Sequence, residues 1–126
     1  MILFDTSVWV DHFGPSTFSL APFLESGQVM MHALVLGEIA MGSLRNRSRT
    51  LLDLSSLPQA GRVSDEEVLV LIESRRLFPR GIGLVDVHLL ASAIVTPPVQ
   101  LRTADRRLAE VAAELGVGGH VSELST

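Results

Sequence analysis

The chain contains no cysteine, which excludes disulfide bonds and thiolate zinc sites from its fold and its chemistry. It also contains no lysine, and all ten of its basic residues are arginine. No apolar run approaches the ~18 residues that a membrane-spanning helix needs. The N-terminus lacks the basic region and the small-residue cleavage site of a signal peptide. Together these absences predict a cytoplasmic protein without a membrane segment.

What the chain does have is apolar residues, which make up 47% of its 126 positions. This length fits one domain with a real hydrophobic core, and some of the apolar surface is expected to face a partner. No repeat, linker or low-complexity tract divides the sequence. A single domain covering 1–126 is therefore expected.

Short apolar segments alternate with longer helical patterns along the chain. Strands are expected at 2–4, 29–31 and 99–101, with a last edge strand near Val121. Helices are expected, in chain order, at 6–13, from Ser16 or Thr17 to Leu24, and at 32–44, 46–57, 65–78, 84–95 and 105–115. This alternation indicates an α/β protein with a mainly parallel sheet.

Two carboxylates follow predicted strands, at the sheet edge where open α/β folds keep their ligands. Asp5 comes directly after the apolar segment 2–4, and Asp105 comes shortly after the third strand. Each also has a complete alternative explanation as the N-cap of the next helix, a role that Thr6 could share near Asp5. Taken singly, neither residue decides between ligand and cap.

Two further carboxylates, Glu38 and Asp86, lie within apolar helical segments. The helical neighbours of Glu38 are Leu34, Val35 and Met41, and burying a carboxylate there costs several kcal/mol unless it is paired, protonated or bound to a metal. An exposed strip or an arginine pair are the alternatives. Asp86 lies in the first turn of its helix, where a favourable interaction with the helix dipole is the alternative.

The four carboxylates are more informative together than singly. Two end strands of one sheet and two lie on helices that should pack against it, so all four can converge on one edge. Clustered carboxylates repel one another unless cations are present, and oxygen ligands without cysteine or clustered histidine suit Mg²⁺ or Mn²⁺. Apart from these four, ten acidic residues balance the ten arginines, so the net charge of −4 equals that of the predicted site.

Four segments carry a resemblance to a known family. They are Leu3-Phe4-Asp5-Thr6-Ser7-Val8-Trp9, Glu38-Ile39-Ala40, Gly83-Leu84-Val85-Asp86 with Leu90-Ala91, and Leu101-Arg102-Thr103-Ala104-Asp105. In this order and spacing they resemble the PIN domain, and within it the VapC toxins of VapBC toxin–antitoxin pairs. The resemblance covers essentially the whole chain and implies a three-layer α/β/α sandwich around a short, mainly parallel sheet.

The resemblance also implies a function. It is that of an Mg²⁺- or Mn²⁺-dependent endoribonuclease, the toxin of a type II pair, which stops translation by cleaving structured RNA such as transfer or ribosomal RNA. It implies a homodimer and a VapB-like antitoxin whose C-terminal segment blocks the active site. By position, the catalytic and metal-binding residues would be Asp5, Glu38, Asp86 and Asp105. The supporting polar residues would be Thr6, Ser7 and Thr103.

Two other functions are open from the residues alone. A phosphatase or phosphotransferase would use Asp5 as its nucleophile, although Ser7 stands where haloacid-dehalogenase-like enzymes have a second acid. A non-enzymatic interaction module would use the same acids only as helix caps and surface charges.

Several other polar residues have weaker predictions. Arg45, Arg47 and Arg49 are candidates for contact with RNA phosphates or with the antitoxin, and a solvated face is the alternative. His88 should point away from the carboxylate two residues before it, towards the surface or a dimer contact. Arg102 should alternate away from its strand neighbours and face solvent.

Overall fold

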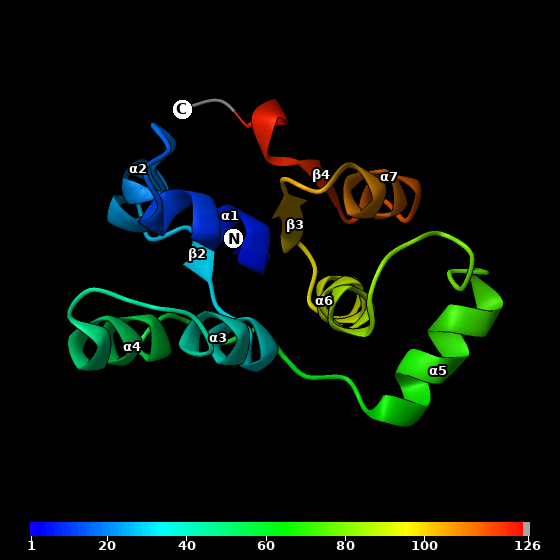
Figure 1. Cartoon of the computed structure of the whole chain (residues 1–126). Helices are drawn as coiled ribbons and strands as arrows, with labels where there is room; N and C mark the ends of the chain where they lie inside the picture. The colour runs from blue at the N-terminus through cyan, green and yellow to red at the C-terminus, as the bar shows by residue number, and fades with distance from the viewer. Residues whose placement is uncertain (125–126) are drawn as a thin grey trace.

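The computed structural model describes residues 1–124, and a sheet of four parallel strands lies at its centre (Figure 1). The strands are β1 (Ile2–Phe4), β2 (Val29–Met30), β3 (Gln100–Thr103) and β4 (Gly118–His120). Their order is β2-β1-β3-β4, so the first strand of the chain is central and pairs with β2 and β3. Because all the strands are parallel, their carboxyl ends lie along one edge.

Helices cover both faces of this sheet, as predicted for a three-layer α/β/α sandwich. They are α1 (Thr6–Phe13), α2 (Ala21–Glu25), α3 (Ala33–Ala40), α4 (Arg47–Ser55), α5 (Asp65–Ser74), α6 (Leu84–Val95) and α7 (Arg106–Glu114), with a 3₁₀ helix η1 (Val121–Glu123). In Figure 1, α2 lies above β2, helices α3, α4 and α6 lie below the strands, and α5 lies beyond α6. Within residues 1–124, no helix has the length and apolar character needed to cross a membrane.

The core explains why β1 and α6 are so apolar. All three residues of β1 are buried, since the strand is covered on both faces, and Trp9 of α1 is buried behind it. Seven consecutive residues of α6, from Val87 to Ala93, are also buried. The middle of α6 therefore has no face exposed to solvent. Its first turn, which carries Asp86, lies near the carboxyl edge of the sheet.

The predicted edge strand near Val121 is wrong in position. The last strand is β4, which ends at His120, and Val121 begins the 3₁₀ helix. A Cβ atom at Gly118 would lie 1.8 Å from the carbonyl oxygen of Leu101 on β3. Only glycine permits this close approach of the two strands.

Three helices are shorter than predicted. Helix α2 begins at Ala21 rather than at Ser16 or Thr17, α3 ends at Ala40 rather than near 44, and α5 ends at Ser74 rather than near 78. After α3, the Arg47 guanidinium donates hydrogen bonds to the carbonyl oxygens of residues 40 and 42, which satisfies the end of the helix. After α5, residue 76 has a left-handed backbone with φ of 54°, which stops the helix.

Candidate active site

Asp5 is placed at the carboxyl end of β1, where it also caps α1. The residue is 5% exposed, and both of its carboxylate oxygens accept short hydrogen bonds from hydroxyl groups. Ser7 donates to Oδ1 and Thr103 donates to Oδ2, each at 2.6 Å, and the backbone N–H of Val8 is 3.4 Å from Oδ1. Asp5 therefore is the N-cap of α1 and is at the same time buried in a network of polar groups. The capping residue is Asp5, not Thr6 or Ser7.

The two hydroxyl groups also accept hydrogen bonds from the backbone that follows β3. The N–H of Ala104 donates to the Ser7 hydroxyl at 3.1 Å, and the N–H of Asp105 donates to the Thr103 hydroxyl at 3.0 Å. Each hydroxyl thus joins the turn after β3 to the Asp5 carboxylate. The direction of that carboxylate is fixed by both strands.

Asp105 lies at the end of the same turn and caps α7. Its Oδ1 accepts from the backbone N–H groups of Arg107 at 2.8 Å and Leu108 at 3.2 Å. The side chain is exposed, in contrast to that of Asp5. Its second oxygen has no hydrogen-bond partner in the described chain, so it is free for a ligand from solution.

The two helix-borne carboxylates are held more lightly. Glu38 is exposed on α3, and its Oε1 accepts a hydrogen bond from the hydroxyl of Thr6 on α1. Asp86 lies in the first turn of α6, where its Oδ2 accepts from the backbone N–H of Gly83 at 2.9 Å. Three of the four carboxylates thus have a local capping bond, but Glu38 has none.

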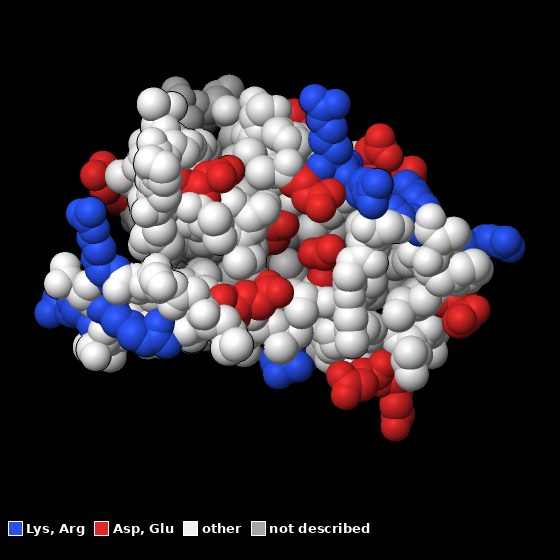
Figure 2. All heavy atoms as spheres, in the orientation of Figure 1, with Lys and Arg blue, Asp and Glu red and all other residues white. Residues whose placement is uncertain are grey.

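The charges of the four carboxylates act on one another through Asp86. Burial raises the pKa of Asp5, the bonds from Ser7, Thr103 and Val8 oppose this, and the charge of Asp86 adds to it. Burial is also the main cause that raises the pKa of Asp86, and the charges of Asp105 and Glu38 raise it further. Figure 2 shows acidic side chains gathered in the middle of this face, with arginines at its margins.

Whether these residues fit a divalent ion depends on how the ion is held. Within residues 1–124, no three histidine, cysteine or acidic side chains lie close enough together to hold an ion by themselves. Mg²⁺ often binds through one or two carboxylates and keeps several of its waters. The pKa values of Asp5 and Asp86 are raised mainly by burial and further by neighbouring carboxylates, and a cation would relieve the part that comes from repulsion.

Each of the three predicted contact arginines has a definite place. Arg47 is bound to carbonyl oxygens at the end of α3, and Arg49 pairs with Asp53 on α4 at 3.1 Å. Arg45 is exposed in the loop before α4 and makes no ion pair within the described chain. Of the three, Arg45 has the guanidinium most available to a partner.

The surface prediction for His88 is wrong. The residue is 5% exposed, and its Nε2 lies 3.6 Å from Oδ1 of Asp65 at the start of α5. It does point away from the site, but the far side of α6 is covered. His32, fully buried at the start of α3, has its pKa lowered to about 4 by burial and by the charges of Arg62 and His88.

Arg102 does not face solvent as predicted. Its side chain is 17% exposed and pairs with Glu123 of η1 at 3.6 Å. Arg102 thus joins β3 to η1, the last described turn of the chain. Sequence alternation gave the correct side of the strand, but η1 covers that side.

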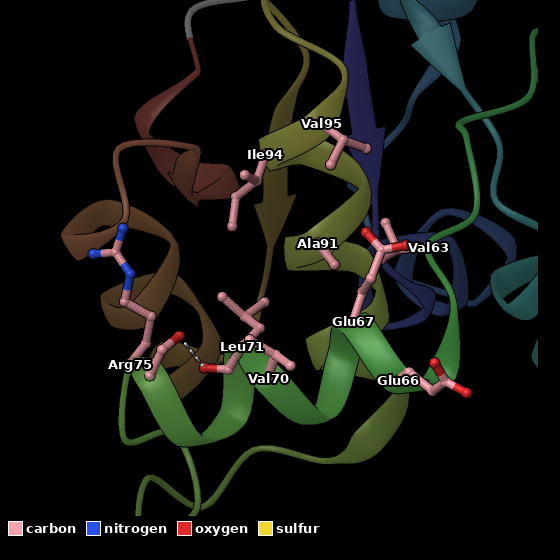
Figure 3. Close-up of a pocket in the computed structure, with 10 residues that line it drawn as sticks. Val63, Glu66, Glu67, Val70, Leu71, Arg75, Ala91, Ile94 and Val95 are labelled. Carbon is pink, nitrogen blue, oxygen red and sulfur yellow. Dashed lines mark hydrogen bonds between the residues drawn. The ribbon is translucent and has the colours of Figure 1, made fainter.

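Two hollows on the surface bear on the function, and one of them adjoins the acidic site. A hollow of about 300 Å³ opens beside Glu38 between α1 and α3, with Val10, Phe13 and Ile39 in its lining. A larger one of about 550 Å³ lies between α5 and α6 (Figure 3), and none of the four carboxylates lines it. Its lining is mostly aliphatic, with acidic residues and Arg75 at its margin.

Comparison with known proteins agrees with the fold and with the motifs. The profile of the PIN domain family matches residues 2–114. The chain is 41% identical over 117 residues to "Ribonuclease VapC32" of Mycobacterium tuberculosis, in strain CDC 1551 / Oshkosh and in strain ATCC 25618 / H37Rv. The alignment covers 93% of this chain and 94% of each relative. The chain therefore belongs to the PIN domain family, and within it to the VapC proteins.

Proposed function

We propose that this protein is an Mg²⁺- or Mn²⁺-dependent endoribonuclease that acts as the cytoplasmic toxin of a type II toxin–antitoxin pair. The observation that carries the proposal is that Asp5 and Asp105 follow the adjacent strands β1 and β3, and that Asp86 is near enough to Asp5, Asp105 and Glu38 for their charges to interact. The ribonuclease activity that gives the relatives their name supports it. The proposed substrate is a structured RNA, either transfer or ribosomal, whose cleavage stops translation.

In this proposal, the carboxylates hold the divalent ion and the hydroxyl groups hold the carboxylates. Asp5, fixed by Ser7 and Thr103, supplies the rigid part of the site. Glu38 is oriented by the hydrogen bond from Thr6 and would approach the ion from helix α3. When bound, the metal would activate a water and stabilise the charge that develops on the phosphate.

The geometry of Asp5 argues against its use as a phosphatase nucleophile. Both of its oxygens already accept short hydroxyl bonds, and the residue is almost fully buried. A nucleophilic carboxylate needs an oxygen free to attack phosphorus. An aspartyl-phosphate trapped on Asp5 would nevertheless reverse this conclusion.

A VapB-like antitoxin is the proposed inhibitor. The hollow beside Glu38 has apolar walls and a carboxylate at its margin. It is therefore suited to an antitoxin segment that carries a large apolar side chain near a basic one. A short reading frame directly upstream, with a DNA-binding start and a mixed-charge tail, would support the pairing.

A homodimer is also part of the proposal, and α5 with α6 offers a face for it (Figure 3). Leu69 and Val70 in the middle of α5 are 61% and 66% exposed. Glu66 and Glu67 precede them and Arg75 follows. An antiparallel two-fold pairing of α5 would set the acids of one copy against Arg75 of the other. Light scattering of the purified protein should give twice the chain mass, and a Leu69→Glu variant should give the chain mass.

The central experiment combines cleavage with metal binding. Asp5→Asn and Asp86→Asn should each lower Mg²⁺-dependent cleavage of total transfer and ribosomal RNA by at least ~100-fold and should relieve growth arrest. Both should also reduce the rise in melting temperature that Mg²⁺ gives the unchanged protein, because that rise reports binding to the folded state. Asp11→Asn, an exposed acid on α1, is the matched control and should leave both readouts unchanged.

Two outcomes would overturn the proposal. Full cleavage by a highly purified Asp5→Asn, Asp86→Asn double variant would place the activity elsewhere. If Mg²⁺ and Mn²⁺ left the melting temperature of the unchanged protein where it was, the carboxylates would be caps and surface charges, as in an interaction module.

A further inference from the structure

An arginine that the proposed function does not use lies at the margin of the acidic site. Arg107 is two residues beyond Asp105, and its backbone N–H donates to the Asp105 carboxylate at 2.8 Å. Its side chain crosses from α7 to the loop before α6. A Cβ atom at Gly81 would lie 2.8 Å from Nη1 and 3.1 Å from Cδ of Arg107. The guanidinium thus rests against the loop that leads into the helix carrying Asp86.

Gly81 makes this position possible. Its φ is +76°, a backbone conformation that favours glycine, and the missing side chain leaves the space that the guanidinium fills. The side chain of Arg107 is therefore supported from α7 and from the loop before α6. A supported cation loses less conformational entropy when it binds a ligand than a free surface arginine does.

The charge of Arg107 is not neutralised within the described chain. Arg80 in the same loop is held by two hydrogen bonds to Glu114, at 2.7 and 2.9 Å, and Arg102 pairs with Glu123. Arg107 makes no ion pair within residues 1–124 and is exposed. Its guanidinium lies against the loop at Gly81, five positions before Asp86, so its charge is available to a polyanion that approaches the acidic site.

We propose that Arg107 binds a phosphate of the RNA strand next to the one that is cleaved, and so guides the strand across the acidic site. This inference rests on the proposed function for the site beside it. A guanidinium binds a phosphate oxygen pair through two parallel N–H donors, and such contacts fix the register of a strand without reading its bases. Arg107 is thus a substrate-binding residue.

The adjacent arginine provides a matched control. Arg106 has the same side chain, is also exposed and is one position earlier on α7. It lines a different hollow, together with Glu110, His120 and Glu123. Loss of Arg106 removes the same charge from the same helix without removing the contact at Gly81.

The experiment measures binding of a short fluorescein-labelled single-stranded RNA by anisotropy, with Ca²⁺ in place of Mg²⁺, across a series of salt concentrations. Arg107→Gln should weaken binding about tenfold at low salt. It should also reduce the slope of log affinity against log salt by about 0.7, the value for one lost phosphate contact on a single strand. Arg107→Lys should restore the slope and part of the affinity, since it keeps the charge but loses the two-donor geometry. Arg106→Gln should leave the slope unchanged.

Several results would overturn the inference. They are an unchanged slope in Arg107→Gln, an equal loss in Arg106→Gln, and a lower melting temperature of Arg107→Gln with normal RNA binding, which would make Arg107 a structural brace. Normal RNA binding with lost inhibition by the antitoxin would assign Arg107 to an acidic group of that partner. If Asp5→Asn still cleaved RNA while the Arg107 slope effect held, the acidic-site proposal would fail and the Arg107 contact would stand.

Discussion

The acidic site and a region around two buried histidines, His32 and His88, share the same two helices. His32 caps α3, which carries Glu38, and His88 is in α6, which carries Asp86. The two regions differ in how their polar groups are hydrogen-bonded. At the acidic site, both oxygens of Asp5 are hydrogen-bonded, and the donors are hydroxyl groups that are themselves bonded to backbone. In the histidine region, Nε2 of His32 and Nδ1 of His88 are buried without any partner in the described chain.

The difference shows which region is built to hold charge. Burial raises the pKa of Asp5, and the hydroxyl donors oppose this because they stabilise the charged carboxylate. His32 has no such support, and its Nδ1 must stay unprotonated to accept the bond from the N–H of Leu34 that caps α3. The first region is suited to binding a cation, whereas the N-cap bond of His32 needs a neutral imidazole.

The largest effect expected from this comparison concerns acid pH. The folded-state pKa of His32 is about 4, well below its ordinary value of 6.5, so protons bind preferentially to the unfolded chain. The stability that neutral His32 contributes is present above pH ~6.5 and is lost as the pH falls towards ~4, by about 3 kcal/mol in all. Urea unfolding at several pH values should show this loss.

The control is His32→Asn, since asparagine is a good N-cap and does not titrate in this range. Asp5 and Asp86 act in the opposite direction, because a carboxyl group with a raised pKa adds stability as the pH falls through that pKa. The quantity to measure is therefore the difference between the unchanged protein and the variant. Parallel pH profiles would mean that His32 is not the buried neutral group described here.

A smaller effect is expected for the hydroxyl that supports Asp5. Thr103→Val keeps the side-chain shape but leaves Oδ2 of Asp5 and the N–H of Asp105 without their partner. Leaving buried polar groups unsatisfied should lower the free energy of unfolding by about 2 kcal/mol. Denaturant unfolding measures this loss, and cleavage should fall at least ~10-fold because the carboxylate loses its fixed direction.

The matched variant at the exposed carboxylate should have the smallest effect on stability. Thr6→Val removes the hydroxyl that donates to Glu38, but that bond is solvent-exposed, so less than about 0.5 kcal/mol is expected. Cleavage should still fall several-fold if Thr6 orients Glu38. If Thr6→Val and Thr103→Val lost equal stability, the exposed Glu38 would be held as firmly as the buried Asp5. The proposed difference between the two carboxylates would then be wrong.

The sequence was sufficient for strands β1 to β3 and for the presence of the helices, because each is encoded locally. Apolar periodicity identified β1 and α6, and a carboxylate directly after a strand predicted its own place at the sheet edge. The PIN domain resemblance, and the fold it implied, are confirmed. The catalytic and metal-binding roles of Asp5, Glu38, Asp86 and Asp105 stay predictions.

What the sequence could not give depends on contacts between distant segments. The composition of β4, Gly118-Gly119-His120, is typical of a turn, and only the approach of β3 makes it a strand. The sequence correctly predicted that His88 points away from Asp86. It could not predict that this side of α6 is buried, because the burial depends on α5, which begins 23 positions earlier, at Asp65. Arg107 gave no local signal, since its position depends on the loop at Gly81.

The hydrogen bond between Asp5 and Thr103 has a consequence for the timing of synthesis. The two residues are 98 positions apart, and the central strand β1 obtains its β3 neighbour only from the last part of the chain. A ribosome that adds roughly 5–20 residues per second makes the first carboxylate seconds before the hydroxyl that fixes it. An unfinished chain lacks the complete acidic edge.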